Sequence, residues 1–102
     1  MLTIQEIKDT VTAYFKDKPV KTVYLFGSYA RGDAKESSDI DLLIDLDYRQ
    51  KIGLEFVRWK LILQELFDKK VDLVPTSTIY EEVKIGADKD KILMLQNNIN
   101  DR

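Results

Sequence analysis

The sequence predicts an α/β (α+β) protein in which helices pack on a small mixed β-sheet. Two long segments repeat apolar residues at the spacing of an amphipathic helix, and three shorter segments are rich in β-branched and aromatic residues. Helices and strands that follow one another in this way pack in layers around one core. The length of 102 residues, with 44% hydrophobic and 33% charged residues, suits a single soluble domain over residues 1–102.

The first half of the chain predicts one helix and two strands. Thr3 and Glu6 have the spacing of a capping box, and apolar residues then recur at helical spacing through residues 4–16. Residues 20–26 form a β-branched and aromatic run that predicts the first strand. A polar stretch follows, and residues 40–46 predict the second strand.

The second half predicts a second long helix and a short third strand. Residues 52–67 place apolar side chains mostly at helical spacing, which predicts a helix that faces the core. Lys69 and Lys70 suit the C-terminus of that helix, because cations are favourable there. Residues 71–74 predict a short strand, which Pro75 ends.

Two further helices are expected towards the C-terminus. Ser77 or Thr78 suits the N-cap of a short helix running through Val83, and Gly86 suits its end. Residues 88–98 are expected to form one more helix.

The composition excludes several classes of site and partner. The chain has no cysteine and no histidine, so a metal would be held by oxygen, which favours Mg²⁺, Mn²⁺ or Ca²⁺. The net charge of -2 argues against direct nucleic-acid binding, which usually needs a basic face. The sequence contains no signal-peptide pattern and no apolar run of membrane-spanning length, so we expect no membrane association and a cytoplasmic location.

A Gly-Ser pair at the end of the first strand predicts a phosphate-binding loop. Gly27 allows a phosphate to approach the backbone, the Ser28 hydroxyl can donate to it, and Arg31 falls on the same face of a following helical turn. The alternative interpretations are a simple strand-ending turn for the pair and a solvated side chain for Arg31. Tyr29 is a further candidate to face a nucleotide.

Carboxylates on two predicted strands indicate a metal site. Asp39 and Asp41 are two residues apart, so their side chains point to the same side and repel each other unless a cation lies between them. Asp72 interrupts an apolar strand and joins them if the two strands are neighbours; such a pocket suits two metal ions about 3.5–4 Å apart. Two alternative interpretations remain open: Asp39 caps a turn, and Asp72 is an edge residue that faces water. Asp45 and Asp47 are expected at the exposed end of the strand.

At this point the sequence resembles the DNA polymerase β-like nucleotidyltransferases. A Gly-Ser pair, ten intervening residues (29–38) and Asp-x-Asp match the signature of that superfamily. The segments Gly-Ser-Tyr-Ala-Arg-Gly-Asp-Ala and Ser-Asp-Ile-Asp-Leu-Leu-Ile are most similar to the minimal nucleotidyltransferases, the MntA-like antitoxins. The motif spans residues 26–45, and the similarity of length and element order extends over nearly the whole chain.

The resemblance implies a polymerase β-like fold and a role for each motif residue. Asp39, Asp41 and Asp72 would be catalytic and hold two Mg²⁺ ions, with Asp72 close to the attacking hydroxyl. Gly27 and Ser28 would bind the β- and γ-phosphates of ATP. Arg31 would neutralise triphosphate charge.

The resemblance also implies a partner. Antitoxins of this type transfer AMP from ATP to a tyrosine of a HEPN ribonuclease toxin, in a hetero-oligomer; a homodimer is also compatible with the sequence. Two alternatives remain open. In the first, the chain is an antitoxin or binding module that acts by complex formation without catalysis. In the second, it is a catalytic subunit that modifies a small molecule or an RNA end.

Overall fold

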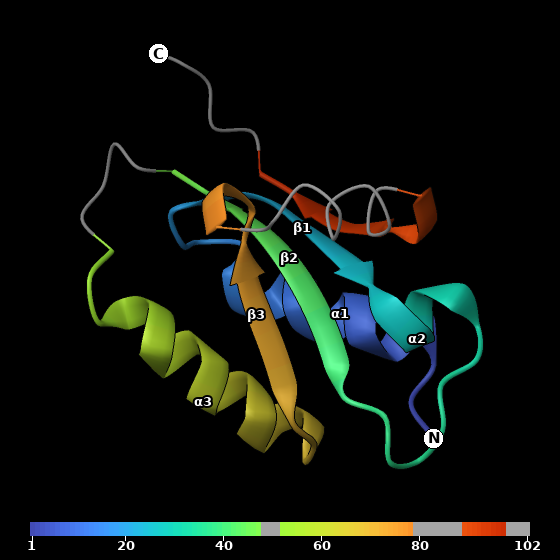
Figure 1. Cartoon of the computed structure of the whole chain (residues 1–102). Helices are drawn as coiled ribbons and strands as arrows, with labels where there is room; N and C mark the ends of the chain where they lie inside the picture. Colours follow the sequence, from blue (N-terminus) through green and yellow to red (C-terminus); the bar gives the residue numbers. More distant parts are fainter. Residues whose placement is uncertain (48–51, 79–88, 98–102) are drawn as a thin grey trace.

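The computed structural model describes residues 1–47, 52–78 and 89–97 (Figure 1). The elements in chain order are α1 (Ile4–Phe15), β1 (Val20–Phe26), α2 (Gly27–Arg31), β2 (Ile40–Leu46), α3 (Glu55–Phe67), β3 (Val71–Pro75), the 3₁₀ turn η1 (Thr76–Thr78) and β4 (Ile92–Gln96). No helix among these ranges has both the length and the apolar composition needed to cross a membrane.

The four strands form one mixed sheet in the order β3-β2-β1-β4. β1 pairs antiparallel with both β2 and β4, whereas β2 and β3 are parallel. A parallel pair needs a crossover connection, and α3 lies in the segment that joins β2 to β3. The predicted small mixed sheet is therefore confirmed, and β2 lies at its centre between β1 and β3.

Helices α1 and α3 pack on the same face of the sheet. The ring of Phe15 in α1 meets the ring of Trp59 in α3 edge-on, with their centroids 5.5 Å apart. Both residues belong to a core cluster that includes the fully buried Ile40, Leu42 and Ile44 of β2. The capping box predicted at the start of α1 is present, since the Thr3 hydroxyl accepts from the N–H of Glu6 and the Glu6 carboxylate accepts from the N–H of Thr3.

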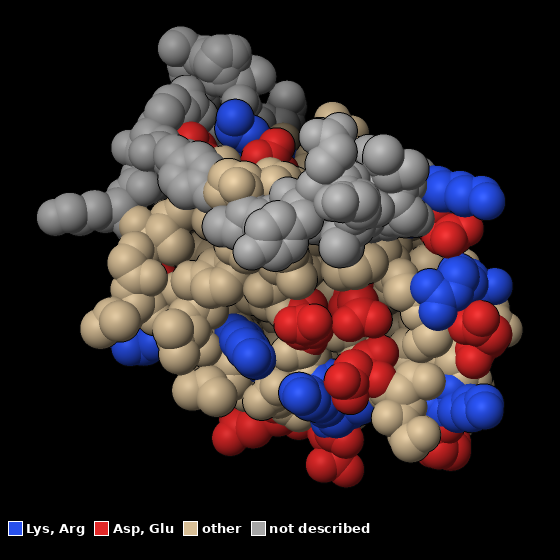
Figure 2. Space-filling model, viewed as in Figure 1, with Lys and Arg blue, Asp and Glu red and all other residues tan. Residues whose placement is uncertain are grey.

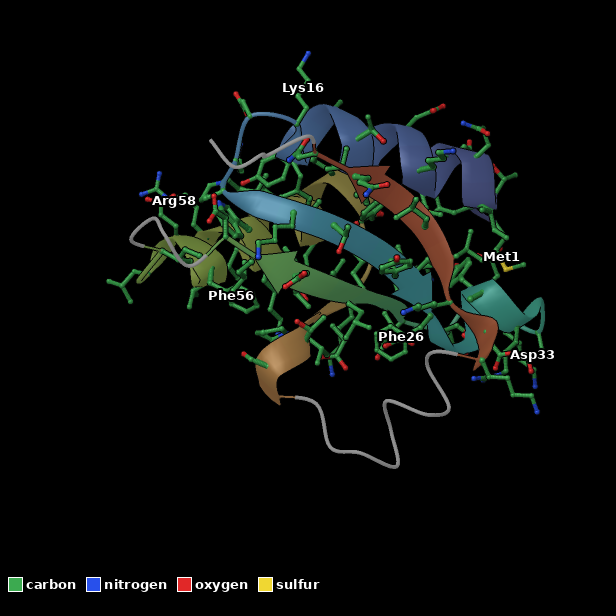
Figure 3. All side chains as sticks on the ribbon, turned by 90° about the horizontal axis from the view of Figure 1, so that it is seen from above. Met1, Lys16, Phe26, Asp33, Phe56 and Arg58 are labelled. Atoms are coloured by element: carbon green, nitrogen blue, oxygen red, sulfur yellow. The ribbon has the colours of Figure 1, made fainter. Side chains whose placement is uncertain are left out.

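The other face of the sheet carries polar side chains of β2. Successive side chains in a strand point to opposite faces, so Asp41 and Asp45 lie on the face away from the buried isoleucines and Leu42. Figure 3 shows Phe26, the last residue of β1, with its ring on the side of the sheet opposite α1. The central strand therefore separates an apolar, helix-covered face from a face that presents carboxylates.

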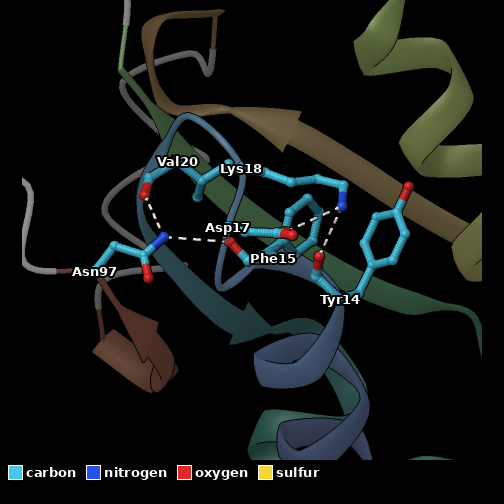
Figure 4. A network of polar contacts seen from close by, with 6 residues as sticks. All are labelled: Tyr14, Phe15, Asp17, Lys18, Val20 and Asn97. Atoms are coloured by element: carbon cyan, nitrogen blue, oxygen red, sulfur yellow. Dashed lines mark hydrogen bonds and ion pairs between the residues drawn. The ribbon is translucent and has the colours of Figure 1, made fainter.

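A hydrogen-bond network joins the C-terminal end of the described chain to the loop after α1 (Figure 4). The side-chain amide of Asn97 donates to the carbonyl oxygen of Phe15 at 3.2 Å and to that of Val20 at 2.8 Å. Nearby, the ammonium of Lys18 donates to the carbonyl of Tyr14 at 3.0 Å. One amide thus joins the last residue of α1, whose carbonyl also accepts from the N–H of Lys18, to the first residue of β1.

The expected C-terminal helix over residues 88–98 is wrong, because Ile92–Gln96 forms strand β4. Leucine and methionine favour helices, so the Ile-Leu-Met-Leu run was ambiguous by periodicity alone. Its partner is β1, whose second edge would otherwise leave backbone groups unpaired, and Met94 on β4 is buried against the core. Tertiary pairing outweighs local helix propensity here.

Three smaller expectations also need adjustment. α3 begins at Glu55 rather than at residue 52. Of the short helix expected from residue 77 or 78 to 83, the structure describes only the start, which lies at η1; the remainder falls outside the described residues. Asp47 is buried rather than exposed, and its backbone N–H donates to the carbonyl of Pro19, which continues the pairing with the β1 side past the end of β2.

Candidate active site

Three of the predicted carboxylates come together at the start of the central strand. Asp41 of β2 and Asp72 of β3 are direct partners in the parallel register, and Asp39 immediately precedes β2. Acidic side chains gather near the centre of the face seen in Figure 2. The adjacency of the two strands, which the sequence left open, is what brings Asp72 to the other two carboxylates.

The electrostatics of the cluster are most visible at Asp41. Partial burial, and after it the negative charges of Asp72 and Asp39, together raise the pKa of Asp41 to about 6. The Arg31 guanidinium acts in the opposite sense and lowers that pKa. Asp41 is thus a carboxylate whose charge is opposed by its surroundings, as expected where a cation normally compensates.

Gly27 lies against the carboxylate of Asp41. A Cβ added to Gly27 would come to 2.2 Å from Oδ2 of Asp41 and 3.0 Å from its Cγ. Gly27 also has a φ of 75°, in the left-handed region that a side chain disfavours. Both the space and the backbone conformation therefore require glycine, and they place the turn after β1 directly beside the acidic cluster.

The turn continues into α2, which carries the other two predicted phosphate-binding residues. The Ser28 carbonyl accepts hydrogen bonds from the N–H groups of Gly32 at 3.0 Å and Asp33 at 3.1 Å, which ends the helix after little more than one turn. Arg31 is largely exposed and its Nε lies 3.4 Å from Oδ2 of Asp33. Such an exposed ion pair is weak, so it leaves Arg31 available to an anionic ligand.

Tyr29 does not face the site as its position in the motif suggested. It is only 4% exposed and belongs to the core cluster. Its hydroxyl is buried without a hydrogen-bond partner. Burial of the ring anchors α2 to the core, which explains the aromatic residue next to Ser28.

The donor chemistry of the cluster fits a hard divalent cation. Carboxylate oxygens are the ligands that Mg²⁺ takes, and a cation would relieve the repulsion at Asp41. Within the three described ranges, however, no group of three or more acidic side chains is arranged to hold a metal ion by itself. Mg²⁺ is commonly held by one or two carboxylates together with substrate phosphates, so the arrangement fits a site that a triphosphate helps to form.

A residue that sequence reasoning assigned only to a helix end also lies at the site. The ammonium of Lys69 donates to the carbonyl oxygens of Glu36 and Ser38, in the loop that leads to Asp39. The pattern at residues 69 and 70 indicated a helix C-terminus and contained no signal for this contact, because the acceptors are more than 30 positions away in sequence.

Comparison of the sequence with known proteins gives consistent matches. A family model described as a nucleotidyltransferase domain matches residues 4–95. Protein adenylyltransferase MntA of Thermococcus cleftensis is 39% identical over 83 residues, which cover 78% of this chain and 83% of that protein. These matches confirm the resemblance to minimal nucleotidyltransferases that the Gly-Ser and Asp-x-Asp motifs indicated.

Solved structures confirm the fold. A crystal structure of a toxin-antitoxin with AMP-PNP superimposes with a TM-score of 0.72 at 20% identity, covering 93% of this chain and 76% of that chain. A tri-AMPylated Shewanella oneidensis HEPN toxin in complex with MNT antitoxin gives a TM-score of 0.69 at 18% identity, covering 91% and 72%. At these identities the likeness concerns the arrangement of helices and strands.

Proposed function

Because this chain belongs to the nucleotidyltransferase domain family, we propose that it transfers AMP from ATP, with Mg²⁺, to a tyrosine hydroxyl of a HEPN ribonuclease partner. The observation that carries this proposal is the contact between Gly27 and Asp41, with Asp72 in register beside them. This contact brings a loop suited to phosphate directly against a cluster suited to a divalent cation.

Each residue of the cluster has a role in the proposed reaction. Asp39 and Asp41, with Asp72, would hold Mg²⁺, which when bound supplies positive charge against the triphosphate. Gly27 and Ser28 would bind the β- and γ-phosphates.

The proposed chemistry is an in-line displacement at phosphorus. The acceptor hydroxyl oxygen forms a bond to the α-phosphorus, the bond from that phosphorus to the β-phosphate oxygen breaks, and pyrophosphate leaves. The carboxylate of Asp72 takes the hydroxyl proton, since the sequence has no histidine to act as base. Arg31 would neutralise charge that accumulates on the phosphates.

The choice of acceptor rests on the relatives. One is named a protein adenylyltransferase, and an AMPylated HEPN toxin accompanies a structurally similar antitoxin. These likenesses support a HEPN protein as acceptor and partner for this chain, and they favour ATP over other nucleotides.

The test is intact-mass spectrometry of a HEPN protein encoded beside this chain, after incubation with the chain, ATP and Mg²⁺. We expect a mass increase of one or more AMP units, located on tyrosine by peptide sequencing. The Asp41→Ala variant should give no increase. Asp45→Ala is the matched control, because Asp45 lies on the same strand and face but outside the cluster, and it should retain transfer.

Two results would contradict the proposal. Transfer that persists in Asp41→Ala would remove the cluster from the mechanism. A tight complex with no mass increase for the unmodified chain would favour a module that acts by binding alone.

A further inference from the structure

Lys69 lies in the turn between α3 and β3, and its ammonium holds the loop that leads to Asp39. The Nζ atom donates to the carbonyl oxygen of Ser38 at 2.9 Å and to that of Glu36 at 2.5 Å. We propose that Lys69 is a positioning residue, which fixes Asp39 relative to the strand that carries Asp72. The relevance of this contact to catalysis rests on the function proposed above, whereas the contact itself concerns only the geometry of the cluster.

The residues on both sides of Asp39 are hydrogen-bonded to the same segment, Lys69 and Lys70. The residue before it, Ser38, is held through its carbonyl by the side chain of Lys69. The residue after it, Ile40, donates its N–H to the main-chain carbonyl of Lys70 at 3.0 Å. Asp39 itself lies before β2, so the Lys69 contact holds the chain just beyond the β2–β3 pairing that begins at Ile40.

The main chain at Lys69 is itself held by hydrogen bonds in the turn between α3 and β3. The N–H of Lys69 donates to the carbonyl of Gln64 in α3 at 3.3 Å. The side chain of Gln64 accepts from the N–H of Val71 at 3.1 Å, which closes the turn into β3. The ammonium also lies 6.0 Å from the centroid of the buried Tyr29 ring, at the outer range of a cation–π contact.

The loop that Lys69 holds has a compact turn of its own. The Ser38 hydroxyl accepts from the N–H of Lys35 at 2.8 Å, and the Ser38 N–H donates to the carbonyl of Lys35 at 2.9 Å. These bonds are local to the turn and do not join it to the sheet. Lys69 therefore supplies a long-range attachment that the turn cannot provide for itself.

Loss of the Lys69 charge and loss of its contact with the loop before Asp39 should have opposite effects on cation affinity. An ammonium near three carboxylates repels an incoming cation, so removing only its charge should strengthen cation binding. Removing the contact should let Asp39 move away from Asp72 and weaken cation binding. The sign of the change in affinity therefore separates a positioning role from a purely electrostatic one.

The experiment compares Lys69→Met and the milder Lys69→Gln with Lys70→Met. Lys70→Met is the matched control, because it removes the same charge from the adjacent residue while its main-chain carbonyl still accepts from Ile40. The first readout is the affinity for Mn²⁺ without nucleotide, which the carboxylates alone should bind more weakly than when phosphates complete the site. It is measured by titration followed by electron paramagnetic resonance. The second is hydrogen exchange at the amides of Ser38 and Ile40, which flank Asp39; the first is bonded to Lys35 within the turn and the second to Lys70 across to β3.

We expect Lys69→Met to bind Mn²⁺ about 10-fold more weakly, within the range seen when groups that orient metal ligands are removed. Exchange at both amides should become faster. Lys69→Gln should change both readouts in the same direction, and it replaces Lys69→Met if that variant does not fold. Lys70→Met should bind Mn²⁺ equally or more tightly and exchange as the unmodified chain does.

The positioning role would be overturned if the Lys69 variants bound Mn²⁺ equally or more tightly, or if their amide exchange were unchanged. It would also be overturned if the unmodified chain did not bind Mn²⁺. AMP transfer is measured separately on the unmodified chain with its HEPN partner. If transfer is absent while the Mn²⁺ and exchange results are as expected, the proposed function fails and the positioning role stands.

Discussion

Replacing Asp41 with asparagine should stabilise the metal-free protein at neutral pH. The pKa of Asp41 rises from its ordinary value of 3.8 to about 6 in the folded chain, so folding disfavours the charged carboxylate. Below pH 3.8 the carboxyl is protonated in both states and carries no penalty. As pH rises from 3.8 through 6 the unfolded state loses its proton first, and the folded state becomes progressively less stable.

The size of the effect follows from the shift and from the exposure of the side chain. The difference between a pKa of 3.8 and one of about 6 corresponds to an upper value of about 3 kcal/mol. Asp41 is only half-buried, so solvent screening reduces this to about 1 kcal/mol. Asparagine has nearly the same shape and no charge, and it should remove this penalty above pH 6.

The assay is urea unfolding in EDTA at a series of pH values, followed by fluorescence of Trp59. Trp59 is the sole tryptophan of the chain and is 2% exposed, so its emission reports loss of the core. The stability difference between Asp41→Asn and the unmodified chain should grow from near zero at pH 4 to about 1 kcal/mol at pH 7.5. Asp17→Asn, at an exposed carboxylate far from the cluster, should show no such growth. A pH-independent difference, or a less stable Asp41→Asn at pH 7.5, would refute the reasoning.

Three further variants test other features. Gly27→Ala should lower Mn²⁺ affinity at least 10-fold and cost about 1–3 kcal/mol of stability, measured by Mn²⁺ titration and urea unfolding, because the new Cβ meets Asp41 and the φ is positive. Asp68→Gly should raise the free energy of unfolding, measured in urea, by about 0.5–1 kcal/mol. Asp68 adopts a left-handed φ of 52° and places a negative charge at a helix C-terminus, and glycine removes both costs. An unchanged free energy of unfolding would contradict this. Asn97→Ala should lower the melting temperature through a loss of about 1–2 kcal/mol, because the carbonyl of Val20 loses this donor and that of Phe15 keeps the N–H of Lys18. It should leave Mn²⁺ affinity unchanged, and a change in that affinity would contradict the separation of this network from the cluster.

Features whose physical cause lies within a few residues could be predicted from the sequence. The capping box at Thr3 is a local signal, and the helix begins where it predicts. The alternation around Asp41 correctly placed carboxylates opposite the buried face of β2.

Features set by distant parts of the chain were harder to predict. β4 depends on the free edge of β1, which is more than 60 residues earlier, so its Ile-Leu-Met-Leu run gave no local reason to expect a strand. Asp47 is buried where its N–H pairs with the carbonyl of Pro19, 28 positions earlier, and the Lys69 contact requires α3 to end beside the loop before β2. In each case the deciding partner is remote in sequence, and no periodicity within the segment records it.

The acidic cluster and the stability of the fold oppose each other at Asp41. The central strand would be more stable in the metal-free state with a neutral side chain there. The carboxylate of Asp41 instead lies beside Gly27, which leaves room for it, and the charges of Asp72 and Asp39 act on it. A sheet selected only for stability would not place like charges in register on adjacent strands, because their repulsion is a direct cost. Such a local conflict is expected at functional sites, where a ligand offsets it. A bound cation would offset the conflict at Asp41, which agrees with the cation that the motif residues suggested.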